Sequence, residues 1–163
     1  MNKNVILICQ AAIIAALYVV LTMLIGAFAS GPIQIRISEA LTVLPCFTPA
    51  AIPGLTIGCF FANLFTGCAA PDVLFGTLAT LLGALGSYAL RNRSKWLVPL
   101  PPVIANTIIV PFVLRYAYHL PDAIPYMMAT VGIGEILSCY ILGMFLLFAL
   151  DKFGKPLFHK EIH

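Results

Sequence analysis

Residues 5–29 read VILICQAAIIAALYVVLTMLIGAFA, an apolar run without a single charged residue. A transmembrane helix needs about 20 such residues, whereas the apolar core of a signal peptide has only about 7 to 15. We therefore interpret this stretch as a retained transmembrane helix from Asn4 to Phe28. It ends at Ser30-Gly31-Pro32, where glycine and proline break the helix.

The rest of the chain has the same apolar character. Hydrophobic residues make up 61% of the 163 positions and charged residues 9%, against about 25% charged residues in a soluble domain. Gly, Pro and charged residues divide the remainder into five further spans, near residues 39–52, 54–67, 72–90, 96–118 and 123–150. The sequence thus predicts an all-α integral membrane protein, with residues 1–163 forming one six-helix transmembrane domain.

The basic residues predict how this domain is oriented. Seven of the nine Lys and Arg residues lie before the first span, between the fourth and fifth, or after the sixth. With six spans these places share one side, which the positive-inside rule makes cytoplasmic, so both termini face inward. The formal charge of +3 is therefore a topology signal and does not indicate nucleic-acid binding.

A short segment after the first span has a different pattern. Residues 33–38, IQIRIS, alternate between apolar and polar positions, which is typical of extended backbone. We expect an extended, lid-like loop between helices 1 and 2 that carries Arg36. The alternative for Arg36 is a solvated ion pair with Glu39.

Polar residues within the spans are the candidates for function. Glu135 lies about 15 Å from the outer end of the last span, where an ionisable group costs at least about 2.5 kcal/mol and needs a cavity or a partner. Four other polar residues are expected in the outer half of the bundle or at its face: Glu39, Asn63, Asp72 and Asn106. Helix capping by the acids and interhelical hydrogen bonding by the amides are the structural alternatives.

Together these acceptors and amides suit a ligand rich in N–H donors. Four aromatic residues are candidates for stacking on such a ligand, although lipid-facing or core positions are the commoner use: Phe60, Phe61, Tyr126 and Tyr140. The five cysteines form no C-x-x-C pair and have no histidine at ligand spacing, so we interpret them as small buried hydrophobic residues and expect no metal site.

Small residues on the first helix favour close helix packing. Ala11, Ala12, Ala15 and Ala16 form two overlapping small-x-x-x-small pairs. Packing inside the bundle and docking of another membrane subunit are both consistent with them.

The sequence contains no phosphate-binding G-x-x-x-x-G-K-[ST] loop, no H-E-x-x-H motif and no G-x-S-x-G motif. A protein that holds costly polar residues but lacks these motifs is expected to bind and translocate a substrate, not to act as an enzyme. A carrier working alone with Glu135 as a proton site, an intramembrane enzyme and a structural subunit are the alternatives.

Three stretches in order carry a family resemblance: Ile33 to Leu41, Asn63 to Asp72, and Gly132-Ile133-Gly134-Glu135. Through them the whole chain resembles the queuosine-precursor transporter family, QueT, among the substrate-binding S components of energy-coupling factor (ECF) transporters. The resemblance implies a subunit of a bacterial plasma membrane that captures a 7-deazaguanine such as queuine or preQ0/preQ1. An S component for another vitamin or nucleobase is the alternative.

The resemblance also implies partners and roles. A transmembrane coupling subunit and two ATPase subunits would drive uptake, with no cofactor in this chain. Residues 33–38 would close over the ligand, and the four alanines of the first helix would dock on the coupling subunit. The substrate-binding residues would come from this set: Glu135, Asn63, Glu39, Asp72, Asn106, Arg36 and Tyr140.

Overall fold

The computed structural model describes residues 2–26 and 35–153, and within these ranges the chain is helical and contains no strand. The α-helices are α1 (Lys3–Gly26), α2 (Ala51–Phe65), α3 (Ala70–Leu90), α4 (Leu100–Tyr116), α5 (Ile124–Glu135) and α6 (Gly143–Phe153). Two 3₁₀ segments, η1 (Ile37–Cys46) and η2 (Lys95–Leu97), and one π-helical segment, η3 (Ile136–Leu142), connect them.

Four helical stretches are long and apolar enough to cross a membrane: Lys3–Leu24, Ala70–Leu90, Lys95–Tyr116 and Ile124–Lys152. The other two apolar helices, η1 and α2, are shorter. The all-helical fold is therefore confirmed and is consistent with a membrane protein, while the count of six spans and the orientation stay predictions. Many large apolar side chains on these helices are exposed, as expected where lipid is the solvent.

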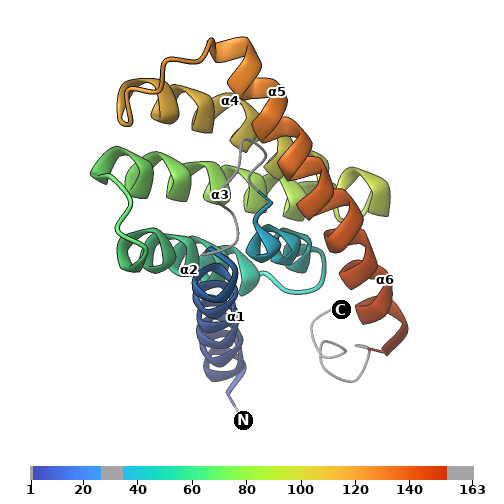
Figure 1. The fold of residues 1–163 in the computed structure, drawn as a ribbon. Coiled ribbons are helices and arrows are strands. Elements are labelled where there is room, and N and C mark those ends of the chain that lie inside the picture. The colour runs from blue at the N-terminus through green and yellow to red at the C-terminus, as the bar shows by residue number, and fades with distance from the viewer. Residues whose placement is uncertain (1, 27–34, 154–163) are drawn as a thin grey trace.

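The helices pack in chain order. Figure 1 shows α2, α3 and α4 stacked beside one another, while α5, η3 and α6 run as one continuous rod across them. Helix α1 packs against α2, and η1 lies between α1, α3 and the last helical rod. Segment η1 therefore occupies the middle of the bundle.

The predicted break in the proline-rich stretch was misplaced. We expected short spans over 39–52 and 54–67, but η1 ends at Cys46 and α2 begins at Ala51. Pro53 lies in the first turn of α2, where the backbone N–H has no intrahelical partner to lose. The break falls instead at residues 47–50.

The extended segment is also shorter than predicted. Residues 33 and 34 lie outside the described residues. Arg36 is extended, with φ of −103° and ψ of 100°, but Ile37 and Ser38 already belong to η1. The prediction of extended backbone was wrong at Ile37 and Ser38, because both residues belong to a 3₁₀ helix packed within the bundle.

Glycines allow the closest helix contacts. A Cβ added at Gly58 would lie 2.8 Å from the Cβ of Tyr18 and 3.0 Å from the Cα of Ala15, both on α1. One added at Gly83 would lie 2.7 Å from the Cα of Pro102 on α4. Any side chain at these two positions would push neighbouring helices apart.

Candidate functional site

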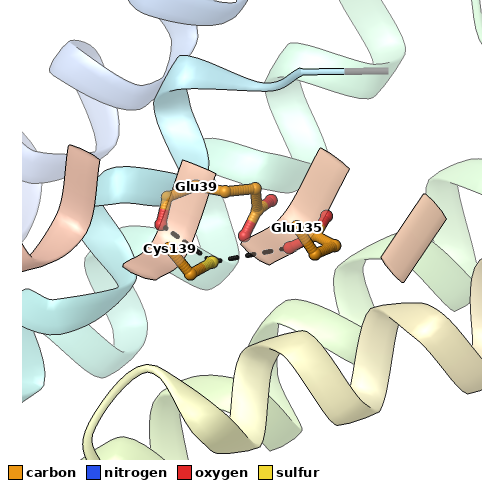
Figure 2. Close-up of side chains that lie close together, drawn as sticks. All are labelled: Glu39, Glu135 and Cys139. Carbon is orange, nitrogen blue, oxygen red and sulfur yellow. Dashed lines mark hydrogen bonds between the residues drawn. The ribbon is translucent and has the colours of Figure 1, made fainter. Parts of the chain in front are cut away.

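Two buried carboxylates and a thiol meet in the middle of the bundle. Figure 2 shows Glu39 from η1 pointing toward Glu135 and Cys139, which lie on the last helical rod. One ligand atom from each of these three residues lies within 4.8 Å of the other two. The Cys139 thiol contacts Glu135 Oε2 at 3.5 Å and the backbone oxygen of Glu39 at 3.6 Å. The predicted interior position of Glu135 is confirmed, because only 5% of this residue is exposed.

The helix that carries Glu135 changes from α-helical to π-helical geometry after this residue. Helix α5 ends at Glu135, and the chain then forms the π-helical segment η3 before α6 begins. Ser138 donates a hydrogen bond to the backbone oxygen of Gly134 at 2.9 Å. A π-helical turn shifts the register of the side chains that follow it and often marks a functional site. Cys139 lies in this segment, four residues after Glu135.

Glu39 is held from α1 but retains a free acceptor. The hydroxyl of Tyr18 donates to Glu39 Oε1 at 2.5 Å. The other oxygen, Oε2, is buried and has no hydrogen-bond partner in the described part of the chain. Glu39 is only 1% exposed, so a solvated ion pair with Arg36 does not account for it, whereas its place in the first turn of η1 fits the alternative of a role at a helix terminus. A buried carboxylate oxygen without a partner is costly unless a ligand satisfies it.

Asn106 of α4 adds an amide to the two acids. Its side chain lies within reach of both Glu39 and Glu135. Its Nδ2 atom is nevertheless buried without a hydrogen bond of good geometry to any described residue. The centre of the bundle thus presents one unsatisfied acceptor, Glu39 Oε2, and one unsatisfied donor, Asn106 Nδ2.

Asn63 and Asp72 form a second group, where α2 meets the start of α3. Their side chains gather over Gly76, where an added Cβ would lie 3.0 Å from Asn63 Nδ2 and 3.4 Å from Asp72 Oδ1. Asp72 Oδ2 accepts a hydrogen bond from the hydroxyl of Tyr118 at 2.9 Å. Tyr118 in turn accepts one from the backbone N–H of Ala69 at 3.1 Å.

The charge of Asp72 acts on this tyrosine. Burial raises the pKa of Tyr118, and the hydrogen bond to Asp72 and the charge of that carboxylate raise it further. The phenol is therefore a firm donor that holds the start of α3 to the end of α4. This contact supports a structural role for Asp72, in addition to the binding role predicted for it.

Cys59 connects the two groups. Its sulfur accepts hydrogen bonds from Asn63 Nδ2 at 3.5 Å and from Thr80 Oγ1 at 3.2 Å. On its other side it lies near Tyr18 and Glu39. A polar track therefore runs from Asp72 through Asn63 and Cys59 to the paired carboxylates.

Arg36 lies near this track without forming an ion pair in the described residues, where the ion pair found is Lys95–Asp151. Burial alone would lower the pKa of Arg36, but nearby groups, including Glu39 and Asp72, raise it overall. The guanidinium therefore stays charged and partly offsets the negative charge of the acids. The structure brings Arg36 to the same region as Glu39 and Asp72.

The predicted aromatic residues do not join the polar track. Tyr140 packs against a buried apolar cluster that includes Val43 and Leu147. Phe60, Phe61 and Tyr126 are exposed on the outer surface. Their positions fit the alternative of lipid-facing or core residues.

Two residues of the site, Tyr18 and Cys139, were not among those predicted from the sequence. Tyr18 lies within the most apolar helix, and no spacing signal marks it. Cys139 stood among the cysteines we took for small buried hydrophobic residues, yet it follows Glu135 by four residues, a spacing that places two side chains on one helix face. The burial predicted for all five cysteines holds for Cys59 and Cys139 but not for Cys9, which is exposed.

The alanines of α1 lie on a different surface. Ala11, Ala12 and Ala15 line an apolar groove of about 540 Å³ between α1 and the first half of α2, and Ala16 is exposed. Ala15 also packs against Gly58 of α2. Internal packing and an open surface thus both occur along this stripe.

Comparisons with known proteins agree on one family. The family described as QueT transporter matches residues 8–152. The chain is 33% identical, over 158 residues, to the queuosine precursor transporter QueT of Lactococcus lactis subsp. cremoris. That similarity covers 88% of this chain and 89% of the relative. No solved structure matches the chain.

Proposed function

Because the chain belongs to the QueT transporter family, we propose that it is the substrate-binding S component of an ECF importer. In this role it captures a queuosine precursor, a 7-deazaguanine base such as queuine or preQ0/preQ1, for ATP-driven uptake. The family is one of transporters and not of enzymes.

The unsatisfied donor and acceptor in the bundle centre support this proposal most directly. A guanine-like edge offers N–H donors at N1 and at the exocyclic amine, beside a carbonyl oxygen. Among the described residues, Glu39 Oε2 is a buried acceptor without a partner and Asn106 Nδ2 a buried donor without one, and Glu135 lies next to both. Glu39 or Glu135 could accept the two N–H groups together, and Asn106 could donate to the carbonyl oxygen.

Asn63 and Asp72 extend this arrangement toward the connection between α2 and α3. In the predicted topology, six spans with both termini inside, that connection and the segment before η1 would lie on the outer side. A base entering from outside would then pass Arg36 and Asp72 before it reaches the carboxylate pair.

The coupling subunit and the two ATPase subunits would be the partners of this chain. The apolar groove beside Ala11, Ala12 and Ala15 is the surface we propose for the coupling subunit. Its small residues permit a close approach of another helix in the membrane.

The deciding experiment is the identification by mass spectrometry of the ligand that copurifies with the full-length protein. We expect a 7-deazaguanine; a different vitamin or nucleobase would retain the S-component role but change the substrate. Glu135→Ala should weaken binding of the base by more than about 2 kcal/mol, because a buried ligand donor loses its charged acceptor. Asp122→Ala, in an exposed loop, is the matched control. Unchanged affinity in a folded Glu135→Ala protein would refute the assignment.

The carboxylate pair also favours a second candidate, an ion-coupled carrier that works alone. Two carboxylates this close do not both ionise readily in a buried site, so one of them is suited to hold a proton. Uptake by the isolated chain in liposomes, driven by a proton gradient, would support this function. Uptake that requires the ATPase subunits would exclude it.

A further inference from the structure

A separate cavity lies at the end of the bundle that carries the basic loop. It has a volume of about 220 Å³ and is enclosed by residues 45–49, which join η1 to α2, and by Tyr88, Arg91 and Asn92 at the end of α3. None of these residues belongs to the polar track, and only Pro49 also lines the alanine groove. The proposed transport role assigns nothing to this cavity.

Arg91 is fixed along one wall of the cavity. Its guanidinium carbon lies 3.7 Å from the centre of the Tyr88 ring, and Nη1 donates to the backbone oxygen of Tyr88 at 2.7 Å. The guanidinium has five N–H donors, and its side chain makes no other hydrogen bond to the described residues. A fixed, planar fork of free N–H groups is the arrangement that binds phosphate oxygens best.

The surrounding charge is positive. Arg93 and Lys95 follow Arg91 within one short turn, and Lys95 is paired with Asp151 at 2.6 Å. The carbonyl end of α3 disfavours an anion, but the bond from Arg91 to the Tyr88 carbonyl oxygen partly neutralises that end. Because Asp151 offsets Lys95, Arg91 is the cation on the cavity wall that favours an anion.

The cavity also lies at the level expected for lipid headgroups. Trp96 is 62% exposed and packs edge-on against Phe148, with 6.0 Å between the ring centres. Exposed tryptophans favour the boundary between hydrocarbon and water. The basic loop is predicted to be cytoplasmic, and basic pockets between transmembrane helices on that side suit anionic headgroups.

We propose that this cavity binds a phosphate group through Arg91, presented by the headgroup of an anionic phospholipid. The lipid would hold the connection between η1 and α2 against the end of α3. The same chemistry would accept inorganic phosphate from solution, so the test must separate the two sources.

Full-length protein in mixed micelles of phosphatidylglycerol and phosphatidylcholine tests the proposal by native mass spectrometry. We expect preferential retention of phosphatidylglycerol, lowered about fivefold by Arg91→Gln and little changed by Arg93→Gln, whose position does not line the cavity. Displacement of the retained lipid by excess inorganic phosphate would assign the site to soluble phosphate. Equal retention of both lipids, or equal losses in the two variants, would overturn the proposal.

A second measurement uses the unaltered protein. Cys46 lines the cavity and is half-buried, whereas Cys9 is exposed and lies on α1. Phosphatidylglycerol should slow maleimide labelling of Cys46 relative to phosphatidylcholine and leave the labelling of Cys9 unchanged. Labelling of Cys46 at the same rate in both lipids would contradict occupation of the cavity.

Discussion

Glu39→Gln separates a ligand-binding role of Glu39 from a structural one. The amide oxygen of glutamine can still accept a hydrogen bond from the hydroxyl of Tyr18, so the contact to α1 is retained. The amide nitrogen takes the place of Oε2, the oxygen without a partner. The substitution therefore converts one free acceptor into a donor and removes one negative charge beside Glu135, with almost no change in shape.

The size of the effect follows from these contacts. Hydrogen bonds to charged groups contribute about 1.5 to 3 kcal/mol, so the dissociation constant of the base should rise about 10- to 150-fold. The ligand-free protein should not lose stability, because the substitution removes the buried charge of Glu39, which lacks a full set of hydrogen-bond partners. Lower affinity with an unchanged or higher melting temperature is the expected combination.

Isothermal titration of the purified full-length protein with a 7-deazaguanine measures the affinity, and thermal unfolding in the same detergent measures the stability. Asp122→Asn is the control, since it removes an acid from an exposed loop. Unchanged affinity together with a lower melting temperature would show that Glu39 supports the fold and does not bind ligand. That result would refute the assignment of Glu39 Oε2 as an acceptor for the ligand.

Three further outcomes test packing, docking and titration. Gly83→Ala should destabilise the protein by about 1 to 3 kcal/mol, measured by thermal unfolding, and Gly132→Ala, with its nearest contact at 3.3 Å, should cost less. Ala15→Leu should keep ligand binding but abolish pull-down of the coupling subunit; normal pull-down would contradict our docking surface. Tyr118→Phe should lower stability by about 0.5 to 1.5 kcal/mol. Because folding raises the pKa of Tyr118 above about 10, its contribution is complete below pH 10 and lost as pH rises further; unfolding curves of the two proteins should therefore converge only in strong alkali.

The helices and one half of the site could be predicted from the sequence. Long charge-free runs predict spans because no water is available in the bilayer to satisfy an exposed backbone. The same physics makes Glu135 stand out, because an acid at that depth is expensive wherever the helix points. Its burial follows from composition and chain position alone.

The other half of the site depends on tertiary structure. Glu39 was expected to open a span at the outer face, but η1 carries it inward to Glu135, and Tyr18 reaches it from a helix whose apolar pattern marks no single position. These residues are 21 and 96 positions away from Glu39 in sequence, so no periodicity links them. A proline-rich 3₁₀ segment also obscures the helical period from which a buried face is usually recognised.

Segment η1 holds Glu39 inside the bundle and not at its end. Glu39 contacts Tyr18 in the middle of α1 and lies beside Glu135, deep in the bundle. A short 3₁₀ helix is tolerated at this depth only because protein covers its backbone, and Ser38 to Pro45 are buried. Because η1 begins after Arg36 and its other end at Cys46 lines the cavity beside Arg91, this segment carries the chain past the carboxylates toward the basic end of the bundle.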